Sequence, residues 1–179
     1  MEPVRQLDLS LIQYAAGFID GEGCLTLVYH KARGGYSPEF RALLAVVNVD
    51  PRPLKALQKA FGGTVCLDKA RAPGTNRRPY HHWQISGQGL QALLPHLAPH
   101  LIVKREQAAL LLEYFLFRES LPPSCVRRTQ EQLAVLATFV EEGHILNKRG
   151  LAAADTDHRR AVLHQVRERR KQHLKAATG

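Results

Sequence analysis

Apolar residues recur along this chain at two spacings, and together these spacings predict an α+β fold. A spacing of three to four residues predicts helices, and strict alternation predicts strands. The expected order is α-β-β-α-β-β-α followed by C-terminal helices, with one antiparallel sheet packed under helices. The predicted helices span residues 8–20, 50–62, 104–118, 129–142 and 156–174, and the predicted strands span residues 24–31, 39–49, 64–69 and 80–86.

Cap residues and prolines set the ends of these elements. Asp8 or Ser10 can cap the first helix and Asp50 can cap the second, whereas Pro95 and Pro99 are expected to break the apolar segment 90–101. At 179 residues the chain is long enough to bury a core, and we expect one domain. Its core is expected at about 8–120 and its C-terminal helices at about 128–175.

The chain is strongly basic, with 25 Lys and Arg residues, 16 acids and a formal charge of +9. This excess favours a polyanionic partner such as nucleic acid, although charge alone is equally compatible with a basic protein that has no such partner. No apolar run reaches the ~18 residues needed to span a membrane, and no signal peptide is visible. Three scattered cysteines predict a reducing, intracellular compartment and no disulfide framework. An organelle or a prokaryotic cytoplasm fits this expectation. Because there is no CxxC pair, a structural zinc site is not expected.

Two acids follow the first apolar helix pattern. Asp20 and Glu22 are separated by Gly21, and Gly23 ends the run. A helix C-terminus carries partial negative charge, so each acid there costs about 0.3–1 kcal/mol. Two carboxylates at such a place indicate that a bound ligand offsets this cost. The usual ligand is a divalent cation, which prefers hard oxygen ligands.

Three stretches of sequence carry a resemblance to a known family. Residues Ala15–Gly23 resemble the motif of the LAGLIDADG homing endonucleases. Val46–Pro51 is similar to the strand end at which that family places Gln or Asn near its metal. Leu101–Ala108 is similar to the basic stretch that opens the helix after the sheet in single-motif members. The resemblance covers about Leu11 to Gln107 and implies a sheet that forms a DNA-binding saddle.

The resemblance implies a site-specific double-strand DNA endonuclease, intron-encoded, that hydrolyses phosphodiester bonds with a divalent metal. Glu22 and the carbonyl of Gly21 would bind Mg²⁺, Asn48 would orient water, and Lys104 would offset charge in the transition state. Mn²⁺ is expected to replace Mg²⁺, and Ca²⁺ to bind without supporting turnover. Asp20 would cap and orient the motif helix, and Arg52 would be a second basic residue of the site.

The chain has a single copy of the motif, and by resemblance this implies a homodimer. Single-motif members form homodimers whose motif helices pack on the two-fold axis, which predicts a long, near-palindromic target. The expected interface consists of the small residues and the first acid of the motif helix, namely Ala16, Gly17, Asp20 and Gly21.

Alternation along the strands predicts which side chains face DNA. The apolar core partners would be Leu25, Leu27, Tyr29, Leu67, Trp83 and Ile85. The opposite, DNA-facing set would be Thr26, Val28, His30, Arg41, Cys66, Asp68, His82 and Gln84, joined by Arg77 and Arg78 from a loop. A β-ribbon fits the major groove, where the fork of Arg41 can pair with guanine. A face that is merely solvated is the alternative.

Three other patterns in the sequence do not indicate a functional site. Leu136–Gly143 looks like a second motif copy but has Gly143 at the metal-acid position, so we interpret it as an ordinary amphipathic helix. His96 and His100 are not expected to bind zinc, because two prolines interrupt their spacing and no acid accompanies them. The basic run Arg167–Lys171 is interpreted as a solvated helix face. Two alternative functions remain open: a non-cleaving nucleic-acid binder of this fold, such as an intron-splicing maturase that binds RNA, and a small metal-dependent metabolic enzyme.

Overall fold

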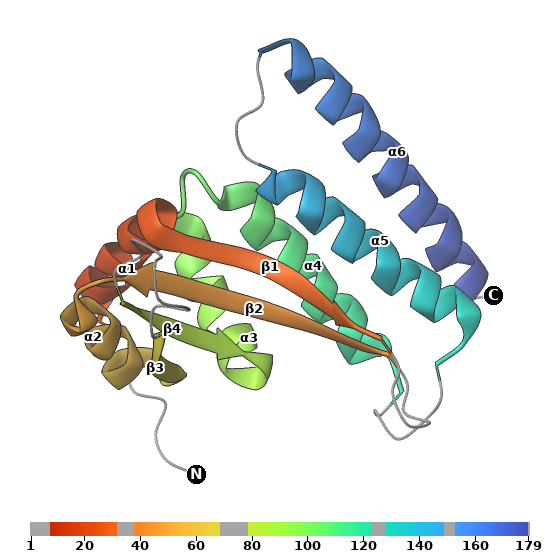
Figure 1. The fold of residues 1–179 in the computed structure, drawn as a ribbon. Coiled ribbons are helices and arrows are strands. Elements are labelled where there is room, and N and C mark those ends of the chain that lie inside the picture. Colours follow the sequence, from red (N-terminus) through yellow and green to blue (C-terminus); the bar gives the residue numbers. More distant parts are fainter. Residues whose placement is uncertain (1–7, 32–37, 69–78, 123–127, 149–152, 179) are drawn as a thin grey trace, which may run out of the picture. The chain divides into compact units, whose positions relative to one another are not determined.

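The computed structural model of the chain describes residues 8–31, 38–68, 79–122, 128–148 and 153–178. The elements, in order, are α1 (Leu9–Glu22), β1 (Gly23–His30), β2 (Glu39–Asn48), α2 (Pro51–Phe61), β3 (Thr64–Asp68), β4 (Tyr80–Ser86), α3 (Gly87–Leu97), η1 (Ala98–His100), α4 (Arg105–Ser120), α5 (Gln130–Asn147) and α6 (Ala153–Thr178). The strands form one antiparallel four-stranded sheet in the order β1-β2-β4-β3 (Figure 1). The predicted α+β order is confirmed.

The chain divides into two compact units, which are described separately. The first unit comprises Met1–Leu25 and Leu43–Ala108, and the second comprises Thr26–Ala42 and Ala109–Gly179. β1, β2 and α4 each contribute residues to both units. The first unit therefore contains α1, α2, α3, β3 and β4, while α5 and α6 belong to the second.

Local side-chain chemistry sets the helix ends of the first unit. The carboxylate of Asp8 accepts a hydrogen bond from the Ser10 N–H at 2.9 Å, and Asp50 accepts one from the Arg52 N–H at 2.9 Å. Both acids are N-caps, as predicted, because their oxygens satisfy N–H groups that a first helical turn leaves unpaired.

Gly62 ends α2, and the next residue, Gly63, allows the chain to pack closely against β4. Gly63 has a φ of +81°, and a Cβ there would lie 2.5 Å from the carbonyl oxygen of Gln84. The indole N–H of the fully buried Trp83 donates to the carbonyl of Gly62 at 2.8 Å. The turn between α2 and β3 is thereby held against β4.

The segment 90–101 differs from the prediction. Pro95 lies inside α3, which continues to Leu97 before a 3₁₀ turn, so the expected break at this proline was wrong. Leu90, Leu93, Leu94 and Leu97 form a buried stripe along α3. Burial of such a stripe stabilises the helix by more than a single interior proline costs, about 3 kcal/mol.

The second unit has its own apolar core. Leu111, Tyr114 and Phe115 of α4 are buried, as are Leu136 and Phe139 of α5. The Tyr114 hydroxyl donates to the carbonyl of Phe40 at 2.6 Å, and burial raises the pKa of this phenol. The bond ties α4 to the β2 residues of this unit.

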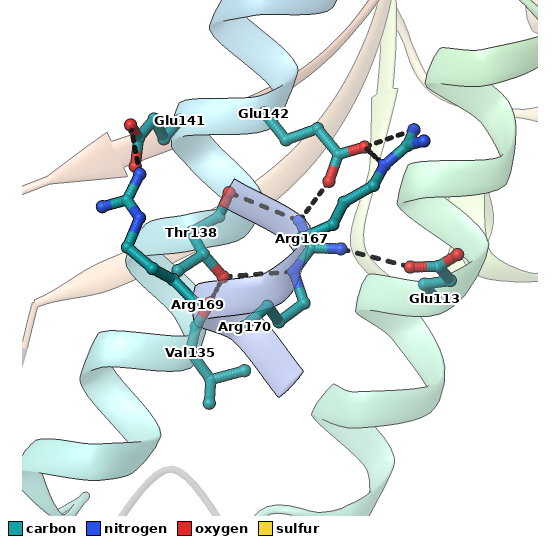
Figure 2. A network of polar contacts seen from close by, with 8 residues as sticks. All are labelled: Glu113, Val135, Thr138, Glu141, Glu142, Arg167, Arg169 and Arg170. Carbon is teal, nitrogen blue, oxygen red and sulfur yellow. Dashed lines mark hydrogen bonds and ion pairs between the residues drawn. The ribbon is translucent and has the colours of Figure 1, made fainter. Parts of the chain in front are cut away.

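The same unit contains a buried ion-pair network, shown in Figure 2. Arg170 of α6, only 6% exposed, bonds to the carboxylate of Glu142 in α5, which is 2% exposed. Its guanidinium also reaches Thr138 and Glu113, and lies 3.8 Å from the centre of the Phe139 ring. The prediction that residues 167–171 form only a solvated face was therefore wrong for Arg170.

The antiparallel pairing of α5 and α6 explains this network. Arg167 and Arg169 bond to Glu142 and Glu141 at 2.7 and 2.8 Å. The arginines of α6 thus act as counter-charges for acids of α5. Glu142 belongs to the motif-like stretch 136–143, and here it is a buried ion-pair partner within a continuous helix, as the helix interpretation of that stretch expected.

Candidate functional site

The C-terminal end of α1 presents the second acid of the motif. Gly21 and Glu22 are exposed, and within the described residues no hydrogen bond or ion pair engages the Glu22 carboxylate. The Gly23 N–H donates to the carbonyl of Ile19 and closes the helix. A Cβ at Gly23 would lie 2.7 Å from that carbonyl oxygen, so glycine is needed for the chain to turn from α1 into β1.

The first acid of the motif, Asp20, has a different role, because both oxygens of its carboxylate accept hydrogen bonds from the chain itself. One oxygen of Asp20 accepts hydrogen bonds from the backbone N–H groups of Ile102 and Val103 at 2.7 and 3.2 Å. The other oxygen accepts from the Lys104 N–H at 3.0 Å. Asp20 therefore clamps the turn that leads into α4 to the end of α1.

This clamp brings a lysine to the acidic end of α1. The ammonium group of Lys104 donates to the carbonyl oxygen of Asp20 at 2.5 Å. It consequently lies at the last turn of α1, the turn that also carries Gly21 and Glu22. Of the residues predicted for catalysis, Glu22 and Lys104 are thus gathered at one helix end, although they are far apart in sequence.

Asn48 lies at the end of β2, directly opposite His81 of β4. Its side-chain carbonyl accepts a hydrogen bond from the Asp50 N–H at 2.8 Å, so it shapes the turn into α2. The amide nitrogen of Asn48 has no partner within the described residues and can still donate.

Arg52 folds back onto its own helix cap. Its guanidinium bonds to the Asp50 carboxylate, with the closest approach at 2.5 Å. These bonds lower the pKa of Asp50 to about 2. The positive charge of Arg52 is therefore engaged with Asp50.

The residues predicted for a dimer interface divide into two groups. Ala16 was expected in the interface, but it is fully buried within the single chain, where it shares the buried side of α1 with Ile12, Ala15 and Ile19. The Asp20 carboxylate is engaged in hydrogen bonds to the backbone at 102–104. Gly17 and Gly21 are exposed, and a Cβ at either would meet no atom within 4 Å.

The register of β2, β4 and β3 identifies which side chains share a face. His82 lies opposite Val47 and Cys66, Gln84 lies opposite Ala45 and Thr64, and Tyr80 lies opposite Asp68. Directly opposed residues of an antiparallel ladder point to the same side. Cys66, Asp68, His82 and Gln84 therefore share one face of the first unit, as alternation predicted.

Four further side chains share this face and were not in the predicted set, namely Ala45, Val47, Thr64 and Tyr80. Tyr80 shares it with Asp68, and Val47, 42% exposed, shares it with His82. Alternation along residues 80–86 could have identified Tyr80, because it keeps step with His82 and Gln84.

The remaining predicted DNA-facing residues lie elsewhere. Thr26 and Val28 are half-buried, and His30 and Arg41 are exposed; all four belong to the second unit. Arg77 and Arg78 lie outside the described residues. Two expected core partners are largely exposed, Leu67 at 50% and Tyr29 at 46%, so their predicted burial was wrong; both lie near the ends of their strands.

The oxygen donors at the end of α1 suit a hard divalent cation. The unpaired carboxylate of Glu22 and the neighbouring main-chain carbonyl of Gly21 are the kind of ligands that Mg²⁺ accepts. Among the described residues, no group of three or more His, Cys, Asp or Glu side chains could hold a metal ion alone. In the same part of the chain, no helix is long and apolar enough to cross a membrane.

The two acids of the motif should respond differently to amide substitution. Asp20→Asn should lower the free energy of unfolding by about 1–3 kcal/mol, because one acceptor of the clamp becomes a donor facing an N–H group. Glu22→Gln, the matched control, should change it by less than about 0.5 kcal/mol. Urea unfolding measures both values, and equal stability of the two variants would contradict the clamp.

Comparison with solved structures relates this geometry to known proteins. The homing endonuclease I-CvuI, in complex with its target, matches with a TM-score of 0.60 and 24% identity, over 88% of this chain and 95% of that one. In a second complex, with the I-CreI target in the presence of Mg, it is 25% identical over 90% and 93% of the two chains, with a TM-score of 0.60.

More distant matches have the same fold. The archaeal intron-encoded homing endonuclease I-Vdi141I, complexed with DNA, is 17% identical over 87% of this chain and 95% of its own, with a TM-score of 0.59. The LAGLIDADG meganuclease I-CpaMI is 16% identical with a TM-score of 0.59, and only 49% of its chain is covered. No protein-family profile and no curated protein sequence matches the chain. The chain therefore has the fold of the LAGLIDADG homing endonucleases, and its near-complete coverage of the I-CvuI and I-Vdi141I chains fits the single-motif type.

Proposed function

We propose that this protein is a metal-dependent, site-specific DNA endonuclease that acts as a homodimer. The observation that carries the proposal is the end of α1, where an unpaired carboxylate, a main-chain carbonyl and a lysine ammonium group lie together. Phosphodiester hydrolysis needs an anionic metal ligand and a cation near the phosphate, and these groups supply both.

Each residue has a definite part in this reaction. Glu22 and the carbonyl of Gly21 would hold the cation, which when bound polarises the phosphate and lowers the pKa of a water molecule. The free amide nitrogen of Asn48 is a donor that can orient water. Lys104 can exchange its bond to the Asp20 carbonyl for the phosphate and offset the developing charge. No covalent nucleophile is required.

The composition of the exposed side of α1 supports dimer formation. Leu9 and Tyr14 are 60% and 51% exposed there, beside Gly17 and Gly21, which allow a second helix to approach closely. Two copies of the chain would supply two Glu22 carboxylates, one for each DNA strand. A two-fold dimer then requires a near-palindromic target.

Gly17→Leu should prevent dimer formation without unfolding the chain. The added side chain enters open space in a single chain, since no atom lies within 4 Å of a Cβ at this position. Between two closely packed helices the same side chain would overlap with the partner. Sedimentation equilibrium should therefore report a folded monomer.

The exposed alanine Ala56 of α2 is the matched control, because Ala56→Leu adds a similar side chain to an exposed helix surface. This variant should remain dimeric. A Gly17→Leu dimer as stable as the unmodified one would place the interface elsewhere.

A nucleic-acid binder without cleavage is the second candidate. The observation in its favour is that the carbonyl of Asn48 is already bonded to the Asp50 N–H, and only its amide group remains for water. An intron-splicing maturase that binds RNA is one form of this candidate.

Selection from a randomised duplex DNA library distinguishes the two candidates. The endonuclease proposal expects double-strand cuts within one near-palindromic sequence in Mg²⁺ or Mn²⁺, and bound but uncut DNA in Ca²⁺. Recovery of bound sequences without cleavage in any of these metals would favour the binding protein.

A further inference from the structure

A carboxylate on the shared face of β2, β4 and β3 is held by a tyrosine. The Tyr80 hydroxyl donates to one oxygen of Asp68 at 2.8 Å, and the two residues are direct partners across the β3–β4 ladder. Both side chains are half-buried and lie beyond the Cys66–His82 pair on this face. The bond orients the carboxylate, because one of its two oxygens is anchored to the neighbouring strand.

The second oxygen of Asp68 has no partner within the described residues. An ionised carboxylate offers acceptors only, so this oxygen can bind a donor and repels another acceptor. On a face that meets a polyanion, an acid is unfavourable unless a donor group lies directly opposite it. The chain as a whole carries a formal charge of +9, so an acid on this face stands out. It should favour DNA bases that present a hydrogen-bond donor and disfavour those that present an acceptor.

Only some base edges satisfy this requirement. In the major groove cytosine presents the N4 amino donor without an adjacent ring acceptor, whereas guanine and thymine present acceptors at the corresponding position. Adenine offers an amino donor beside N7, an acceptor that a carboxylate repels. We propose that Asp68, positioned by Tyr80, reads a cytosine in the DNA target. This inference rests on the proposed function in that it assumes a DNA partner.

Tyr80 is a positioning residue in this proposal, because it acts through Asp68. With its hydroxyl removed, the carboxylate can rotate away from the base or turn toward solvent. Preference for cytosine should then weaken while the preferred base stays the same. Asp68→Asn should act differently, because an amide offers both a donor and an acceptor and can pair with N6 and N7 of adenine.

Binding selection on a randomised duplex library in Ca²⁺ tests the proposal without requiring cleavage. The unmodified protein should prefer cytosine by about 5- to 150-fold at one symmetric pair of positions. Asp68→Asn should lose this preference, with adenine accepted there, and Tyr80→Phe should reduce it several-fold at the same positions alone. Tyr29→Phe, which removes a hydroxyl from the other unit, is the matched control and should leave the profile unchanged.

The outcomes separate this inference from the proposed function. Cleavage in Mg²⁺ combined with an unchanged Asp68→Asn profile would overturn the inference and leave the endonuclease proposal intact. Cytosine selection by a protein that never cleaves would support the inference and reject the endonuclease. If Tyr80→Phe matches the unmodified protein at every position, the positioning role of Tyr80 is refuted.

Discussion

Glu22→Gln should abolish DNA cleavage while leaving DNA binding intact. The substitution keeps the size of the side chain and removes its negative charge, so the carboxylate that would hold the cation is lost. We expect the single-turnover cleavage rate to fall by at least about a hundredfold to a thousandfold, the scale on which loss of one charge-stabilising group acts. Binding measured in Ca²⁺ on the selected target should change by less than about tenfold, because phosphate and base contacts supply most of that affinity.

Glu131→Gln is the matched control, since Glu131 is an exposed glutamate in the first turn of α5 and belongs to the other unit. It should cleave at the rate of the unmodified protein. Turnover by Glu22→Gln in Mg²⁺ would rule out Glu22 as the metal ligand. Loss of folding in that variant would instead contradict the free, exposed position of its side chain.

Arg170→Met should be the most destabilising single substitution in the second unit. Arg170 and Glu142 are both almost fully buried, and among the described residues the variant leaves Glu142 only the half-exposed Arg167 as an ion-pair partner. Removing one member of a buried ion pair typically costs about 3–5 kcal/mol, because the remaining charge stays desolvated. The midpoint of urea unfolding should shift accordingly.

Arg169→Met provides the control on the same helix. Its pair with Glu141 is about half exposed on both sides, so the loss should be no more than about 1 kcal/mol. The double variant Glu142→Leu and Arg170→Leu should recover much of the lost stability, because it leaves no buried charge. A small effect of Arg170→Met, similar to that of Arg169→Met, would show that Glu142 is solvated in solution.

Much of the fold follows from local sequence patterns. The alternation of residues 80–86 and the cap at Asp50 identified β4 and the start of α2, because strand faces and helix starts depend on neighbours a few residues away. The same patterns placed Cys66, Asp68, His82 and Gln84 on one face. Local rules failed at Pro95, since the stripe of leucines that keeps α3 helical gains its stability from burial against other elements.

The candidate site was only partly accessible from the sequence. The motif singled out Asp20 and Glu22 together, because the pattern of two acids around a glycine is local. Their separate roles depend on residues more than eighty positions away: Asp20 accepts hydrogen bonds from the backbone at 102–104, whereas the Glu22 carboxylate has no hydrogen-bond or ion-pair partner within the described residues. The burial of Ala16 and the bond between Tyr80 and Asp68 likewise required the packed chain.

Sequence by itself determined the order of the elements, the faces of the strands and the single copy of the motif, because each depends on spacing within a short stretch. The tertiary structure alone decided which charged groups are free and which are neutralised. Arg170 and Arg169 stand side by side in one basic run, yet one is buried against Glu142 and the other is half exposed. Whether a charge is available to a ligand depends on the groups that folding brings against it, and these come from distant parts of the chain.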